Sequence, residues 1–215
     1  FDTIDINMGC PVRKVVNSGS GSAFLKDPQR ITDTLAGVKS VLTRPLTAKC
    51  RLGFTRDAMN ITDVAPRIVA AGCDALTIHG RTRECTYAWP VQYRMIDTGA
   101  KAARAVNPAV PVIGNGNVFD LATAVRMVDD AGVDGVMVSR GALGNPWIFR
   151  ELTDPSFRQP TIEEWLDGVM RHVEFHLEHY GDTEFAARLI RKHLIWYANG
   201  FPSCSKLREF FNTVT

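Results

Sequence analysis

The chain has 215 residues, of which 45% are hydrophobic and 22% charged, a composition that excludes disordered and fibrous architectures. Its 25 basic and 23 acidic side chains leave a net charge of +2, so charge alone indicates no nucleic-acid partner. No apolar run is long enough to predict a membrane span or a signal peptide. Because the chain begins Phe1-Asp2-Thr3, without methionine, we expect a fragment of a longer protein.

Five short apolar segments are each followed by a polar turn and then by a helical pattern. This alternation predicts parallel βα units and an α/β fold. The expected strands are Thr3 to Met8, Leu46 to Arg51, Ala75 to His79, Val110 to Ile113 and Gly135 to Val138.

Capping residues mark several helix boundaries in the same region. The boundaries are expected at Asp27-Pro28 and Asp120, where helices begin, and at Gly72 and Gly132, where helices end. Pro66 lies inside the helix that Gly72 ends, and we expect it to shorten or kink that helix.

A break in composition at residues 153–160 predicts a linker between a domain of residues 1–152 and an all-α domain of residues 161–215. No strand pattern returns after the break. Thr161 and Glu164 form a capping-box pattern at the start of the second domain. Its helices are expected from Thr161 to Gly181, from about Asp182 to Asn199 with Gly200 as the end, and from about Cys204.

Polar loops follow all five expected strands, at the edge of a parallel sheet where active sites form. Ordinary turn chemistry explains any one loop, but five together indicate a site. The loops are Asn7 to Pro11, Lys49 to Gly53, His79 to Arg83, Gly114 to Asn117 and Ser139 to Gly141.

Lys49 and Arg51 lie two residues apart on one strand, so both side chains face the same way and favour anions or carbonyl groups. The alternative is that both side chains extend into solvent from the end of the strand. His79 ends the third strand. It is either a site residue or a buried imidazole of the core. The loops at Gly114 to Asn117 and Ser139 to Gly141 precede helical turns and could hold a phosphate.

The five cysteines are odd in number and form no C-x-x-C pair, which argues against disulfides and structural zinc and for a reducing compartment. Cys10 follows a strand in a Gly-Cys-Pro loop, where packing gives no reason for a thiol. Thiols are mostly protonated at neutral pH, which suits a general acid. The remaining cysteines are expected to be packing residues.

The helical region carries two polar clusters. Three histidines with helical spacing could gather a metal, but no second ligand cluster accompanies them, so we predict an amphipathic helix flank and no metal site. A basic cluster beside Trp196 and Tyr197 indicates either an RNA surface or a solvated helix face. The histidines are His172, His176 and His179, and the basic cluster is Arg188, Arg191, Lys192 and His193.

These motifs together resemble the tRNA-dihydrouridine synthases, over nearly the whole chain. The element from Asp5 to Pro11, with Asn7-Met8-Gly9-Cys10-Pro11, is specific to that family, whereas other flavin barrels share the later loops. The His79 to Arg83 loop and the helix with Arg191-Lys192-His193 are most similar to the bacterial B-type branch.

The resemblance implies an FMN-dependent (β/α)8 TIM barrel followed by a helical tRNA-binding domain, in a cytoplasmic enzyme. Such an enzyme reduces particular uridines of tRNA to 5,6-dihydrouridine with NADPH, and neither a metal nor a protein partner is implied. Cys10 would protonate uracil C5 after hydride reaches C6 from flavin N5. The resemblance implies cofactor contacts from Lys49, His79, Asn115, Gly116, Asn117, Ser139 and Arg140, and substrate contacts from Asn7, Arg51, Arg81, Arg191 and Lys192.

Three features depart from the family. Asn117 stands where Asp is usual and Ser139 where Gly is usual, which phosphate binding by backbone N–H groups would tolerate. About five βα units are present, whereas a closed barrel has eight, so we expect an incomplete barrel with an open sheet edge that binds FMN weakly or not at all. The alternatives are a flavin barrel that reduces a free pyrimidine or other small molecule, and an RNA-binding protein with a decayed site.

Overall fold

One sheet of five parallel strands, in the order β1-β2-β3-β4-β5, forms the first part of this computed structural model, which describes residues 1–199, 201, 202 and 204–213. The neighbours in the sheet are also consecutive in sequence, as in successive βα units of a (β/α)8 barrel. The strands are β1 (Ile4–Asn7), β2 (Leu46–Arg51), β3 (Ala75–His79), β4 (Val112–Asn115) and β5 (Gly135–Met137).

Helices connect the strands and continue after the last one. The α-helices are α1 (Arg13–Asn17), α2 (Pro28–Lys39), α3 (Ile61–Ala70), α4 (Tyr93–Val106), α5 (Leu121–Ala131), α6 (Ile148–Thr153), α7 (Ile162–Tyr180), α8 (Glu184–Tyr197) and α9 (Cys204–Thr213). Two short 3-10 helices are η1 (Gly21–Lys26) and η2 (Arg140–Ala142).

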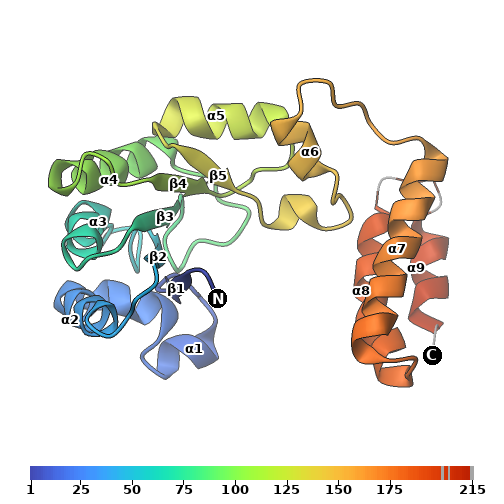
Figure 1. The fold of residues 1–215 in the computed structure, drawn as a ribbon, viewed down its shortest axis with the longest axis horizontal. Coiled ribbons are helices and arrows are strands. Elements are labelled where there is room, and N and C mark those ends of the chain that lie inside the picture. Colours follow the sequence, from blue (N-terminus) through green and yellow to red (C-terminus); the bar gives the residue numbers. More distant parts are fainter. Residues whose placement is uncertain (200, 203, 214–215) are drawn as a thin grey trace. The chain divides into compact units, whose positions relative to one another are not determined.

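The two faces of the sheet differ in chemistry. Figure 1 shows α2, α3, α4 and α5 along one face. The strand residues on that side are apolar and buried. Successive residues of a strand point to opposite faces, so burial of one face leaves the other for a site. The fully buried strand residues on the helix side are Leu46, Ala48, Cys50, Leu76, Ile78 and Val112.

Four of the expected strands fall within one residue of their predicted bounds, but the fourth was wrong by two residues at both ends, since it was expected from Val110 and begins at Val112. The prediction ended that strand at Ile113, whereas β4 continues through Gly114 to Asn115. Gly114 is typical of a turn in sequence, but its backbone lies against the helix side: a Cβ there would meet the sulfur of Met127 at 2.6 Å. The glycine allows close packing inside a strand.

The expected effect of Pro66 was also wrong in part, because α3 continues through the proline to Ala70. Proline removes the N–H that would pair with the carbonyl of Thr62. Thr62 is exposed, so water can satisfy that carbonyl. The helix begins with Asn60 as N-cap, and Gly72 follows its end with a φ of +94°, as predicted.

The chain divides into two compact units, residues 1–118 with 122–139 and residues 119–121 with 140–215. In the second unit the capping box forms as predicted: Glu164 N–H donates to Thr161 Oγ1, and Thr161 N–H donates to the Glu164 carboxylate. The expected helix end at Gly200 lies outside the described residues. In the part of the chain that the structure describes, no helix is both long and apolar enough to span a membrane.

Candidate active site at the carboxyl edge of the sheet

Polar side chains gather on the sheet face opposite the helices. The register pairs Asn7 with Lys49, Arg51 with His79, and His79 with Asn115. Residues paired in register point to the same face, and so do residues two apart on one strand. All five polar residues therefore share one face, near the carboxyl ends of the strands. The sheet brings the predicted residues together.

The Cys10 loop leaves this same edge and is held from two sides. The Asn7 side-chain oxygen accepts hydrogen bonds from the backbone N–H groups of Gly9 (3.0 Å) and Cys10 (3.1 Å). Ser22 donates to the Cys10 carbonyl through both its hydroxyl (2.9 Å) and its N–H (3.0 Å). The cysteine is half-buried. Hydrogen bonds on both sides thus fix the backbone that carries the thiol.

Gly21 and Ser22 are site residues that sequence reasoning missed. Gly21 has a φ of +58°, and a Cβ at this position would lie 2.8 Å from the Cys10 carbonyl oxygen and 2.9 Å from the Cys10 Cβ. Only glycine fits such a left-handed position at so close an approach. The signal was the serine–glycine run at residues 18–22, which a single sequence does not distinguish from an ordinary turn.

Arg51 joins two loops of the site. Its Nε donates to the Gly9 carbonyl at 2.7 Å and its Nη1 to the Thr82 carbonyl at 2.9 Å, and the side chain is only 6% exposed. Burial lowers the pKa of the Arg51 guanidinium, and nearby Arg81 lowers it further, while Tyr87 raises it. Even so, guanidinium groups remain charged in proteins. The structure thus gives Arg51 a scaffolding task that the sequence did not predict.

Arg81 has a similar position in the loop after β3. It is 1% exposed and donates to the carbonyls of Trp89 (2.6 Å) and Tyr87 (3.2 Å) and to the side-chain oxygen of Asn117 (3.2 Å). A buried cation with three oxygen partners orders the chain around it. It ties the loop after β3 to the loop after β4.

The loop after β4, where a phosphate site was predicted, is tied to the end of β5. Asn115 Nδ2 donates to the Met137 carbonyl (2.8 Å) and to the Ser139 hydroxyl (3.2 Å), which links β4 to the end of β5. Gly116 and Asn117 both have positive φ, +129° and +54°. A Cβ at Gly116 would lie 3.8 Å from Cε1 of His79, so the imidazole lies against this turn.

Arg140, also predicted at this site, follows Ser139 in sequence but belongs to the second unit. Its guanidinium lies over the ring of Phe119, 5.4 Å from the centroid. Its role toward a cofactor stays a prediction.

Lys49 is a cation of this edge without an anionic partner among the described residues. Burial lowers the pKa of the Lys49 amine, an effect that Cys50 and Asp5 oppose and Arg51 reinforces. Among the described residues, nothing forms a hydrogen bond or an ion pair with its ammonium group. A partly buried cation without a partner favours an anionic or carbonyl oxygen of a bound molecule.

The thiols differ in their surroundings. Burial raises the pKa of Cys50 and of Cys73 to about 12 each, so both remain protonated and inert. Cys85 contacts the Thr82 hydroxyl at 3.1 Å. Cys10 and Cys85 are both half-buried, Cys10 on the loop after β1 and Cys85 on the loop after β3.

The family described as dihydrouridine synthase (Dus) matches this chain over residues 1–215. The chain belongs to the dihydrouridine synthase family. Three relatives are named tRNA-dihydrouridine synthase B, which agrees with the B-type branch predicted from the motifs.

The dihydrouridine synthase relatives are considerably longer than this chain. The tRNA-dihydrouridine synthase B of Pasteurella multocida (strain Pm70) is 35% identical, with 100% of this chain and 64% of that protein covered. That of Pseudomonas syringae pv. tomato is 38% identical, with 97% and 62% covered. A probable tRNA-dihydrouridine synthase of Rhodobacter capsulatus is 39% identical, with 92% and 60% covered. The chain thus spans 60–64% of these relatives.

In the second unit, the basic cluster on α8 and its aromatic neighbour Tyr197 differ in part from an exposed basic surface. Arg188 pairs with Glu184, and Tyr197 is buried rather than beside a surface. Lys192 is exposed. The Nε–H of Arg191 is buried and has no acceptor among the residues that the structure describes.

The histidines of α7 bind protein groups. His172 Nδ1 lies 3.2 Å from the Tyr197 hydroxyl, and His176 Nε2 lies 2.9 Å from the Ala186 carbonyl. Within the described ranges, no group of three or more potential metal ligands is found.

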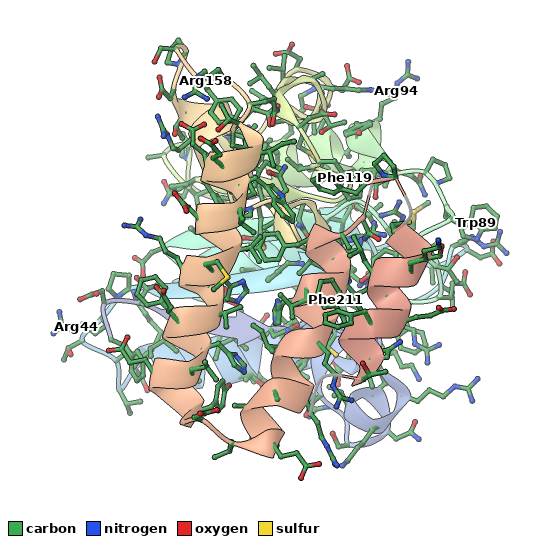
Figure 2. All side chains as sticks on the ribbon, turned by 90° about the vertical axis from the view of Figure 1, so that its right-hand side faces the viewer. Arg44, Trp89, Arg94, Phe119, Arg158 and Phe211 are labelled. Carbon is green, nitrogen blue, oxygen red and sulfur yellow. The ribbon has the colours of Figure 1, made fainter. Side chains whose placement is uncertain are left out.

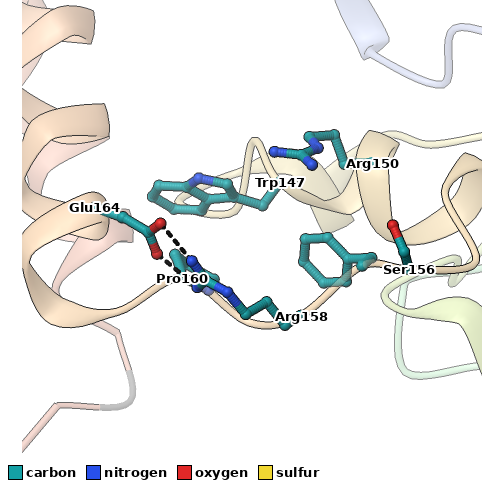
Figure 3. Close-up of a pocket in the computed structure, with 7 residues that line it drawn as sticks. Trp147, Arg150, Ser156, Arg158, Pro160 and Glu164 are labelled. Atoms are coloured by element: carbon teal, nitrogen blue, oxygen red, sulfur yellow. Dashed lines mark hydrogen bonds and ion pairs between the residues drawn. The ribbon is translucent and has the colours of Figure 1, made fainter.

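A cavity of about 400 Å³ in the second unit lies between α6, the following segment and the start of α7. Figure 3 shows its aromatic and basic lining, including Trp147 and Arg150. Arg158 is neutralised there by two hydrogen bonds to Glu164, at 2.6 and 2.7 Å, and Arg150 pairs with Asp154. Both cations of this lining are thus paired with carboxylates.

Proposed function

We propose that this chain supplies the catalytic site of an enzyme that reduces particular uridines of tRNA to 5,6-dihydrouridine, using FMN and NADPH. Membership of the dihydrouridine synthase family supports the proposal. So does the polar sheet face, which places a thiol loop beside a cation without a partner. One relative, from Cryptococcus neoformans, is named tRNA-dihydrouridine(47) synthase [NAD(P)(+)].

The donor groups at the carboxyl edge fit a flavin nucleotide. The Lys49 ammonium suits the ring oxygen and nitrogen that become negative on reduction, because it has no protein partner among the described residues. The Ser139 hydroxyl accepts from Asn115, which leaves its own proton to donate to a phosphate. When bound, FMN would supply the hydride for uracil C6. The residues that would hold it are Lys49, His79, Asn115, Gly116, Asn117 and Ser139.

Cys10 would provide the proton for uracil C5. The C5–C6 double bond gains a hydride at C6 and the thiol proton at C5, and the resulting thiolate regains its proton from water. Asn7 and Ser22 hold the cysteine backbone in place for this transfer. Such preorganisation avoids a search for the reactive geometry.

Asn7 would have a second task on the substrate side. Its side-chain oxygen holds the cysteine loop, whereas nothing among the described residues accepts from its Nδ2. Since Asn7 is exposed, that amide can donate to a uracil carbonyl, where negative charge develops during reduction. Arg51 and Arg81 would act as positioning residues that hold the surrounding loops.

The second unit would bind tRNA. Lys192 is exposed on α8, and Arg191 has a buried N–H without an acceptor among the described residues. Both are suited to phosphate oxygens. The target uridine must leave its stack to reach a flavin, so a separate grip on the RNA would stabilise the extruded form.

The fixed Cys10 loop beside Lys49 is the observation on which this function rests. The test is mass spectrometry of tRNA from cells that lack the gene. We expect one uridine position to lose its two added hydrogens. A gene copy should restore them and a Cys10→Ala copy should not. Unchanged dihydrouridine in the deletion strain would contradict the proposal.

A further inference from the structure

Two cations lie close to one aromatic ring at the rim of the sheet's carboxyl edge. The ring is Phe54, in the loop after β2. The Lys26 Nζ lies 4.1 Å from its centroid, and the Arg83 guanidinium carbon lies 5.2 Å from it. Lys26 ends η1 and Arg83 lies in the loop after β3. Three segments of the first unit therefore converge on this ring.

These two cations have no counter-charge in the described part of the chain. The nearby Glu84 carboxylate is used by Arg56, at 3.2 Å, and Asp57 lies within 4 Å of neither cation. The Nε–H of Arg83 is buried and has no acceptor there. Like charges around one ring repel each other, so a bound anion would stabilise the arrangement.

Backbone hydrogen bonds hold this ring site in place. Arg83 N–H donates to the Gly53 carbonyl at 3.0 Å, which joins the loops after β2 and β3. Asn60 Nδ2 donates to the Leu25 carbonyl at 2.8 Å, immediately before Lys26. The cations thus project from fixed backbones, and less conformational entropy is lost when a ligand binds.

The ring site is joined directly to the proposed catalytic loop. Lys26 is the last residue of η1, and Ser22 of the same 3-10 helix donates twice to the Cys10 carbonyl. A ligand on the ring site would therefore lie on the same side of the sheet as the target base. Trp89, labelled in Figure 2, is 46% exposed and lies 4.5 Å from the Arg56 guanidinium carbon.

We propose that Lys26 and Arg83, both next to the Phe54 ring, bind a phosphodiester of the RNA strand beside the target uridine. This inference rests on the proposed function and deepens it. Two cations match one phosphate, and the ring offers an apolar surface to the adjoining ribose or base. The phosphates of NADPH share this chemistry, so the test separates the two sources.

The test uses the full-length protein with Lys26→Ala, Arg83→Ala and the double variant. We expect each single variant to raise the KM for tRNA about three- to tenfold, with kcat at saturating tRNA and the KM for NADPH unchanged. The slope of log KM against log salt should fall by about 0.7–0.9 for each phosphate that the variant no longer neutralises. FMN content and melting temperature verify that each variant is folded.

Arg44→Ala is the matched control. Arg44 is exposed, lies two residues before β2 at the opposite edge of the same sheet, and forms no ion pair in the described ranges (Figure 2). It should change the KM for tRNA less than twofold, which is about the effect of a distant charge.

Three results would overturn the ring site. The first is a double variant with the KM for tRNA of the wild type. The second is a rise confined to the KM for NADPH, which would assign the ring site to the coenzyme. The third is an equal effect of Arg44→Ala. A wild-type protein that forms no dihydrouridine would instead refute the proposed function.

Discussion

The contact between Gly21 and the Cys10 loop makes Gly21→Ala a specific probe of the site. A Cβ would lie 2.8 Å from the Cys10 carbonyl oxygen, about 0.6 Å closer than an ordinary contact of 3.4 Å. Because the atom it meets is backbone, the loop must move by a comparable distance. A misplacement of about 1 Å at reacting groups costs about a hundredfold in rate. We therefore expect kcat for tRNA reduction to fall about tenfold or more.

Two matched variants separate this effect from general instability. Gly19 also has a positive φ, +77°, but the atoms nearest to its Cβ belong to the flexible Arg30 side chain. Gly19→Ala should share the strain of about 1–2 kcal/mol and keep kcat. Gly37→Ala lies in α2 with open space around it and should stabilise the protein by about 0.5–1 kcal/mol.

The assay is steady-state kcat at saturating tRNA, with urea denaturation and FMN content for each variant. We expect Gly21→Ala to lose far more activity than its loss of stability explains. If the kcat of Gly21→Ala stayed within twofold of the kcat of Gly19→Ala, the contact between Gly21 and the cysteine loop would not contribute to catalysis.

Three further changes test the scaffold. Arg51→Lys cannot reproduce the two buried hydrogen bonds of the guanidinium, and urea denaturation should show a loss of about 2 kcal/mol; an unchanged midpoint would contradict this. Gly168→Ala should lower the free energy of unfolding, although alanine favours helices, because its Cβ would lie 2.6 Å from the Trp147 ring. The tryptophan fluorescence of the folded protein should shift in the same variant. Arg158→Ala should raise the pKa of Glu164, which hydrogen bonds from Arg158 now lower from 4.5 to about 2. Since the folded pKa is depressed, this stabilisation is present above pH 4.5 and lost as pH falls through about 2, which carboxyl NMR titrations of both proteins would follow.

The strands were predictable because local patterns determine them. β2 and β3 have the predicted bounds, since apolar residues and polar turns mark both ends. The end of β4 was missed because a glycine such as Gly114 is compatible both with a turn and with a strand that packs closely against a helix. Only the packing of Met127 against Gly114 distinguishes these two cases.

The sequence predicted which residues gather at the candidate site, but not the hydrogen bonds that they form there. Strand alternation placed Lys49 and Arg51 on one face. That Arg51 binds two loop carbonyls depends on long-range packing, which periodicity does not contain. The support of Cys10 by Ser22, twelve positions later, was missed for the same reason.

The burial of Tyr197 follows from tertiary packing as well. It lies edge-on to the rings of Trp147 and Trp165, with centroids 6.4 and 6.0 Å away. It lines an apolar cavity together with Leu194 of α8 and Phe211 of α9, and Phe211 is labelled in Figure 2. The aromatic residue next to a basic cluster therefore belongs to the core of the three-helix region, not to an RNA surface.

The role of Cys10 as proton donor is tested most directly by a single-turnover experiment. The full-length protein is first reduced with NADPH and then mixed with unmodified tRNA, for the wild type and Cys10→Ala. We expect equal rates of reduction by NADPH, and a rate of dihydrouridine formation that is lower in Cys10→Ala by a factor on the order of 10²–10⁴. Dihydrouridine formation within a few-fold of the wild type would show that another group supplies the proton.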